Sequence, residues 1–168
     1  MALQLSIPTH RLAAATRGLV RAGPSAAAAL QAALFAATVA LVLMVFLGIV
    51  AYDESPWKFL RMVAAIVKGP DALEPDDEFS FAIVATGLAF YYSLAMLYGL
   101  AVAPLLGDCP RRYANILGLA FGFALYSANF HGFTVLFPWF SELRTVDTLF
   151  AHLVFGFLLA RAYCAFRS

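Results

Sequence analysis

Four polar residues in the second half of the chain stand within otherwise apolar sequence, and their side chains are the ones best suited to chemistry. They are Ser127, Asn129, His131 and His152. Polar and ionisable residues inside membrane helices are costly to place there and are therefore candidates for function. Two imidazoles at similar depth could bind a b-type haem or a metal, or could hydrogen-bond a quinone. The alternative is that each group is satisfied by a neighbouring hydroxyl, side chain or water.

Motifs of known catalytic sites do not occur in the chain. The sequence contains no GxxxxGK phosphate loop, no HExxH, no CxxC and no GxSxG. Cys109 and Cys164 are not spaced as a metal or redox pair. We therefore predict that the protein is not an enzyme and has no metal site. We also predict no resident cofactor, with haem b and quinone as the alternatives.

The composition places the chain in a membrane. Of its 168 residues, 63% are hydrophobic and 12% are charged, whereas soluble domains carry roughly 25% charged residues. Three runs without Asp, Glu, Lys or Arg cover 22–52, 79–107 and 113–141. Each exceeds the roughly 20 residues that a helix needs to cross a bilayer. A fourth run, 148–160, becomes long enough if Arg161 extends its guanidinium to the headgroups.

These runs predict an all-α membrane protein, a four-transmembrane-helix bundle, because an open strand in lipid could not satisfy its backbone hydrogen bonds. The basic segment 1–25 is predicted to be a cytoplasmic flank, and 26–166 the four-span membrane domain. The predicted spans are 26–51, 79–105, 114–137 and 147–166.

The connection between the first and second spans, called the first outer connection below, is predicted to contain an amphipathic helix, 56–68, that lies in the membrane interface. Ser55 can cap this helix and Pro56 suits its first position. Its apolar face would hold Phe59, Met62, Val63 and Ile66, and its polar face Lys58, Arg61 and Lys68. Trp57 in this connection and Trp139 in the third are predicted to be interface anchors.

Small residues predict where the helices pack. Gly118 and Gly122 form a GxxxG pair, and Gly99 and Gly156 lie in the returning spans. In span three we predict that the small and polar face meets protein and that an aromatic stripe meets lipid or a partner. One small and polar face comprises Ala120, Ala124, Ser127 and His131, and a further strip comprises Gly118, Gly122 and Asn129. The aromatic stripe comprises Phe123, Tyr126, Phe130, Phe133 and Phe137. Span one carries a stripe of alanines at helical spacing, Ala29, Ala33, Ala36 and Ala40.

Short motifs recur in the two halves of the chain and suggest a duplicated two-helix hairpin. Pro-Trp follows a span at 56–57 and again at 138–139, and Tyr98-Gly99 and Phe155-Gly156 lie in the returning spans. A wider set of motifs resembles the pattern in a group of small proteobacterial inner-membrane proteins, some of which are named as sodium–proline symporters. These motifs are Pro56-Trp57, Gly69, Tyr98-Gly99, Phe137-Pro138-Trp139-Phe140 and His152-Leu153-Val154-Phe155-Gly156. The resemblance implies a four-span inner-membrane protein and brings no established activity. Four spans are too few for the repeat-built bundles of secondary transporters.

Charge placement predicts orientation and location. The N-terminal flank, the second connection and the C-terminus hold seven of the eleven Lys and Arg residues, and nine of the ten acids lie in the first and third connections. The positive-inside rule then places both termini in the cytoplasm. We predict the bacterial inner membrane, with the mitochondrial inner membrane as the alternative, because the acid-free flank with its arginines also fits a transit peptide. Nothing in the composition indicates nucleic-acid binding.

The predicted function is that of an accessory, assembly or partner-binding component of a membrane complex. Besides the lipid bilayer, its partner would be another protein or a second copy, contacted through small-residue helix faces. One alternative is an oligomeric transport unit for small solutes or ions. Another is a haem- or quinone-binding membrane protein that uses His131 and His152.

The predicted threading can be tested by labelling. A cysteine introduced by Glu74→Cys should react with a membrane-impermeant maleimide in intact cells, whereas one introduced by Arg111→Cys should react only after permeabilisation. Cys109 and Cys164 are replaced by serine in both variants, so that each carries a single thiol. Labelling of both positions from the same side would overturn this topology.

Overall fold

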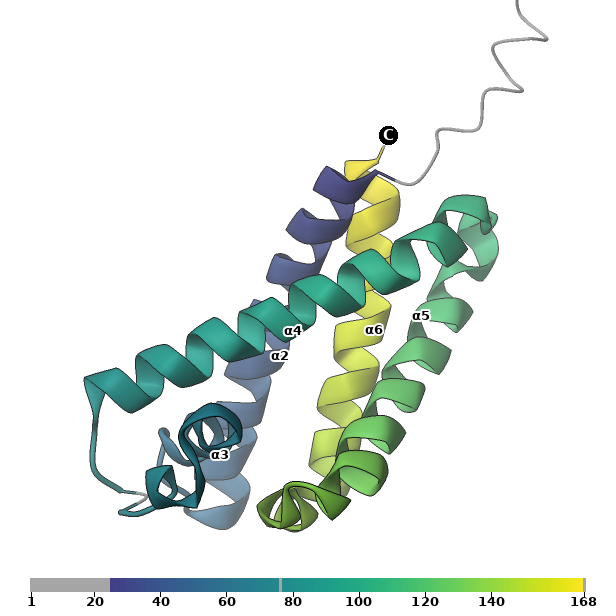
Figure 1. Ribbon diagram of the computed structural model, residues 1–168. Helices are drawn as coiled ribbons and strands as arrows, with labels where there is room; N and C mark the ends of the chain where they lie inside the picture. The colour runs from purple at the N-terminus through teal and green to yellow at the C-terminus, as the bar shows by residue number, and fades with distance from the viewer. Residues whose placement is uncertain (1–24, 76, 168) are drawn as a thin grey trace, which may run out of the picture.

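The computed structural model describes residues 25–75 and 77–167, which form an all-α bundle (Figure 1). Four helical segments are long and apolar enough to span a membrane: Ala26–Tyr52, Phe81–Gly107, Arg112–Val135 and Val146–Phe166. The predicted fold class is thus confirmed, and the span ends differ from the predicted ones by at most two residues. Apart from Ser25, the predicted basic flank lies outside the described residues.

The helices keep the labels of Figure 1. The long ones are α2 (Ala26–Tyr52), α4 (Phe81–Asp108), α5 (Arg111–Ser127) and α6 (Val146–Phe166). The third span continues beyond α5 through a π-helical turn, η2 (Ala128–Gly132), and a 3-10 turn, η3 (Phe133–Val135). The first outer connection holds α3 (Lys58–Lys68) and η1 (Pro70–Ala72), and the third holds η4 (Pro138–Leu143).

The start of α2 and the end of α6 meet at the same end of the bundle (Figure 1). Ser25 caps α2 by accepting a hydrogen bond from the N–H of Ala28 at 3.2 Å. The N–H of Ser25 donates to the hydroxyl of Tyr163 at 3.2 Å, and Tyr163 is fully buried. The chain therefore enters its first span and leaves its fourth on the same side.

The alanine stripe of α2 is a helix-packing surface, as predicted. Its four residues, Ala29, Ala33, Ala36 and Ala40, are all buried. Gly99 of α4 faces this stripe so closely that a Cβ at Gly99 would lie 2.7 Å from the Cβ of Ala33 and 2.9 Å from the carbonyl oxygen of Ala29. Small side chains therefore let α4 approach α2 at this level, which is how helices gain contact area in lipid.

Helices α5 and α6 touch backbone to backbone through three of the glycines that the sequence singles out. A Cβ at Gly122 would overlap the carbonyl oxygen of His152, and one at Gly118 would overlap that of Gly156. A Cβ at Gly156 would in turn overlap the carbonyl oxygen of Gly118. These glycines therefore lie at a close helix–helix contact, and that contact lies within this chain.

The predicted face with Ala120, Ala124, Ser127 and His131 does not pack against another long helix within the described part of the chain. Ala120, Ala124 and His131 are exposed. Ala120 and Ala124 each follow a packed glycine by two residues, which in an α-helix is a rotation of about 200°. Because the glycines face α6, these alanines point away from it. Within this chain the predicted contact with protein is therefore not made by them or by His131, and for a partner it stays a prediction.

The aromatic stripe predicted on the same span is divided between surface and core. Phe123 is 56% exposed, whereas Phe130, seven residues later, is 3% exposed. Seven residues are nearly two α-helical turns, so an unbroken helix would present both rings on one side. The π-helical turn η2 shifts that register, because its hydrogen bonds enclose one more residue than α-helical ones. The prediction that the whole stripe meets lipid or a partner is therefore wrong for Phe130.

The amphipathic helix predicted in the first connection is present as α3 and begins two residues later than predicted. In Figure 1 it is seen end-on, so it runs across the bundle rather than along it. Met62 and Val63 are buried on its apolar face. The helix thus covers one end of α4 with apolar side chains.

Arg61 of α3 does not lie on the polar face predicted for it. Its side chain is 2% exposed. Its guanidinium donates hydrogen bonds to the carbonyl oxygens of Ala72, at 3.1 Å, and Glu78, at 2.6 Å. The segment that follows α3 folds back over Arg61, and backbone carbonyls replace the water that a solvent-facing arginine would bind. The helical spacing could not reveal this return of the chain.

The glycine contact between α5 and α6 predicts an order of mutational effects. Gly122→Leu should destabilise the protein by several kcal/mol, because the new side chain would have to displace the backbone of α6 at His152. Phe133→Leu, at a ring that is 49% exposed, should cost about 1 kcal/mol or less. Thermal unfolding in detergent measures both. The reverse order would refute this assignment of faces.

Candidate functional site

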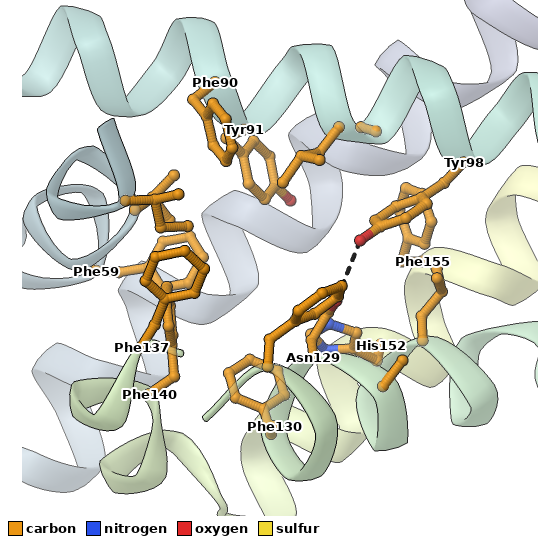
Figure 2. Close-up of a pocket in the computed structure, with 17 residues that line it drawn as sticks. Phe59, Phe90, Tyr91, Tyr98, Asn129, Phe130, Phe137, Phe140, His152 and Phe155 are labelled. Carbon is orange, nitrogen blue, oxygen red and sulfur yellow. Dashed lines mark hydrogen bonds between the residues drawn. The ribbon is translucent and has the colours of Figure 1, made fainter. Parts of the chain in front are cut away.

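A cavity of about 570 Å³ lies between α3, α4, the end of the third span, η4 and α6 (Figure 2). Aromatic rings make up most of its wall: Phe59, Phe90, Tyr91, Tyr98, Phe130, Phe133, Phe137, Phe140 and Phe155. No charged side chain or thiol of the described residues lines it. Its volume is in the range of small-molecule sites, and its composition suits a lipophilic ligand with a small polar group.

The cavity exists because α4 does not pack along α5. The two helices are joined at Cys109 and Pro110 and then diverge, while α2, α6 and α5 stay closely packed (Figure 1). Bulky residues of α4, among them Phe90 and Tyr98, face the space that this divergence opens (Figure 2). Small residues let α5 pack closely against α6, whereas large residues of α4 line the space between α4 and the third span. The bundle therefore has one closely packed side and one side with a cavity.

The polar part of the wall is formed by Tyr98, Asn129 and His152, which come from three different helical segments (Figure 2). The hydroxyl of Tyr98 donates to Oδ1 of Asn129 at 3.1 Å. Asn129 belongs to the π-helical turn, and its side chain reaches α4 from there. The amide NH2 of Asn129 makes no hydrogen bond within the described part of the chain, so it is available to a ligand.

His152 is held in one orientation at the cavity wall. Its Nδ1 lies 2.9 Å from the carbonyl oxygen of Thr148. Because a carbonyl can only accept, Nδ1 carries the proton, and Nε2 of the neutral ring keeps its lone pair. The imidazole packs edge to face against Phe130, with ring centroids 5.2 Å apart, and against Tyr126 at 6.0 Å.

The structure brings two of the four predicted polar residues to the cavity. Asn129 and His152 line it. Ser127 instead donates to the carbonyl oxygen of Phe123, in its own helix, at 3.0 Å. His131 is exposed and does not line the cavity, although its ring packs against Tyr126 at 5.5 Å, close to His152. The cavity thus presents one imidazole of this pair.

Tyr98 was not predicted as a site residue from the sequence, and two neighbouring tyrosines of α4, Tyr91 and Tyr92, hydrogen-bond to α2. The Tyr91 hydroxyl donates to the carbonyl oxygen of Ala37 at 3.0 Å, and that of Tyr92 lies 3.0 Å from the hydroxyl of Thr38. Tyr98 follows Tyr91 by seven residues, which places both on one face of α4. This seven-residue spacing is the feature of the sequence that could have assigned Tyr98 to the same face as Tyr91.

Arg144 stabilises the irregular backbone that carries Asn129. Its Nε donates to the carbonyl oxygen of Phe130 at 2.6 Å, and its Nη2 donates to the hydroxyl of Thr134 at 2.5 Å. Where a helix leaves the α geometry, some backbone carbonyls lose their usual donors and need others. The guanidinium supplies one of these donors and links the π-helical turn to the third connection.

The two predicted tryptophan anchors both pack against protein. Trp139 donates from its indole N–H to the carbonyl oxygen of Met62 at 3.1 Å, which joins η4 to α3. Trp57 packs against Phe79, with ring centroids 4.9 Å apart. Both rings are half-buried, so they can also reach the headgroup level.

Lys58 forms a second link between the first and third connections. Its Nζ lies 2.9 Å from Glu54 and 3.6 Å from Glu142. The hydrogen bond to Glu54 raises the pKa of Lys58 above its ordinary value, although partial burial opposes this shift. Lys58 is therefore charged at neutral pH.

The described residues contain no group of three or more His, Cys, Asp and Glu side chains placed to hold a metal. The cavity wall instead offers hydrogen-bonding groups and aromatic rings. These groups can bind and orient a ligand. Neither a carboxylate nor an activated nucleophile of the described residues faces the space, which favours binding over catalysis.

Comparison of the chain with protein-family models, with curated proteins and with solved structures finds no match. The geometry of the cavity is therefore the basis for a functional assignment.

The role of Arg144 leads to a prediction. Arg144→Met should leave the carbonyl of Phe130 with a weaker partner, and we expect a loss of about 1 kcal/mol in stability. Amide hydrogen exchange should rise at residues 128–136 while the middle of α2 is unaffected. Arg161→Met, which removes an exposed cation from α6, is the control. Unchanged exchange at 128–136 would contradict this role.

Proposed function

We propose that this chain is a non-enzymatic membrane protein that binds one lipophilic small molecule in the cavity beside α4 and acts as an accessory component in handling that molecule. The observation that carries the proposal is the combination of a 570 Å³ aromatic cavity with three converging polar residues, Tyr98, Asn129 and His152. Sites for small molecules have this composition, an apolar wall with a few placed polar groups.

The rim of the cavity supports entry from the lipid rather than from water. Ala128 and Phe133 line the cavity and are also exposed on the surface of the third span. Both lie in a segment long and apolar enough to be embedded in the bilayer. A ligand dissolved in the membrane could therefore enter sideways, past these residues, and leave its tail among the lipids.

The proposed location is the bacterial inner membrane, with both termini in the cytoplasm. The support is the distribution of arginines in the sequence, together with the contact between Ser25 and Tyr163, which sets the start of α2 and the end of α6 at one end of the bundle. In this orientation α3 and η4 lie at the outer face. The cavity that they border then opens in the outer half of the membrane.

A partner protein remains part of the proposal, through exposed small residues of the third span rather than through the glycines. Gly99, Gly118, Gly122 and Gly156 are all occupied by contacts inside the chain. A partner would instead meet surfaces that the bundle leaves exposed, such as the face of α5 that carries Ala120 and Ala124.

Filling the cavity tests the proposal. The protein is purified in a mild detergent, and the small lipophilic molecules that it retains are counted by mass spectrometry. We expect about one per chain in the natural protein and roughly tenfold less in Ala128→Phe, because the new ring occupies the rim of the cavity.

The matched control is Ala124→Phe, which adds the same ring to an exposed alanine one turn earlier that does not line the cavity. This variant should retain the ligand. Equal retention by both variants, or no stoichiometric molecule in the natural protein, would refute the proposal.

A further inference from the structure

We propose that the head group bound at Tyr98, Asn129 and His152 is an aromatic ring bearing a hydroxyl, of the quinol class, and that the site prefers this reduced form to the corresponding quinone. This inference rests on the proposed function, since it names the chemistry of the ligand for the same cavity. It concerns binding alone, and no electron transfer is part of it.

The acceptor of the site is Nε2 of His152. Nδ1 donates to the carbonyl oxygen of Thr148 at 2.9 Å, so the second nitrogen of the neutral ring can only accept. No carboxylate of the described residues lines the cavity to stabilise an imidazolium. A ligand beside His152 therefore has to supply a donor, and among small uncharged groups a hydroxyl does so.

The donor of the site is the side-chain amide of Asn129. Its Oδ1 is already engaged by the hydroxyl of Tyr98 at 3.1 Å, which fixes the amide so that its NH2 is left for the ligand. Asn129 and His152 both line the cavity, and Phe130, which follows Asn129 in the chain, packs against the His152 ring with centroids 5.2 Å apart (Figure 2). The NH2 can donate to a hydroxyl oxygen or to a carbonyl oxygen equally well. Asn129 thus holds either redox form, and His152 distinguishes them.

The surrounding rings match the shape of an aromatic head group. Phe130 packs edge to face against His152 in the wall of the cavity, and Phe155 also lines it. Aromatic side chains favour offset or edge contacts with another ring, so a planar ligand gains contact beyond its simple burial. The rest of the cavity, toward Phe133, is apolar and can hold the first part of an alkyl or isoprenoid tail.

A quinone in the site would leave His152 without a hydrogen-bond donor. Both of its oxygens are carbonyl acceptors, so Nε2 of His152 would face an acceptor and lose its hydrogen bond. An unpaired polar group in an apolar site costs enough to change affinity by roughly tenfold. The preference for the quinol should therefore be of that order and should depend on His152.

The experiment measures the affinity of the full-length protein, in lipid nanodiscs, for two probes kept under anaerobic conditions. The probes are a decyl-substituted benzoquinol and the matching benzoquinone. We expect the quinol to bind roughly tenfold more tightly. His152→Phe keeps a ring against Phe130 and should bring the two affinities together, whereas Asn129→Leu should weaken both.

The control is His131→Phe, which removes an exposed imidazole that contacts Tyr126 but does not line the cavity. It should keep the preference for the quinol. Equal affinity for both probes in the natural protein, a preference for the quinone, or a preference that survives in His152→Phe would overturn the inference.

Failure of this inference can be told apart from failure of the proposed function. If a lipophilic molecule co-purifies and is lost in Ala128→Phe, while the quinol is not preferred, only the head-group assignment is wrong. If neither probe binds and no molecule co-purifies, the cavity is not a ligand site and both proposals are wrong.

Discussion

The backbone contact between α5 and α6 is the constraint on which the site depends. In lipid there is little hydrophobic gain from bringing two apolar helices together, so close approach through small residues is what holds them. Gly122 lies against the backbone of His152, and Gly118 against Gly156. The same contact that joins the helices therefore sets the position of His152 relative to the end of the third span.

The π-helical turn converts this packed pair of helices into a site. Without it, Phe130 would follow Phe123 onto the surface, since seven residues bring an α-helix back to nearly the same side. The turn shifts the register so that Phe130 is buried against His152, in the segment from which Asn129 reaches Tyr98. Such turns are often found at functional sites, where an altered register presents side chains that a regular helix could not.

The outer connections close the end of the cavity and are tied to one another. Trp139 bonds to the backbone of α3, Lys58 bridges Glu54 and Glu142, and Arg144 supports the π-helical turn. The links from Trp139 and Arg144 end on backbone carbonyls, which the sequence does not display as a pattern. They explain why short connections rich in Trp, Pro and Arg form ordered structure here rather than plain loops. The suggested duplication of the hairpin stays a prediction, since Pro56-Trp57 precedes an α-helix whereas Pro138-Trp139 begins a 3-10 helix.

The sequence by itself determined the number of membrane spans, their limits to within two residues, and the residues on which α2 packs and α5 meets α6. Those features depend on the length of apolar runs, the cost of charge in lipid and the size of side chains, which are properties of each segment alone. Only the tertiary structure decided that Arg61 is buried and that Ala120 and Ala124 face outward. It also decided that Asn129 and His152 line the cavity, whereas Ser127 and His131 do not. These outcomes depend on contacts between distant segments and on one extra residue in a helical turn. Small energy differences between competing registers select them, and the spacing of residue types along the chain does not contain those differences.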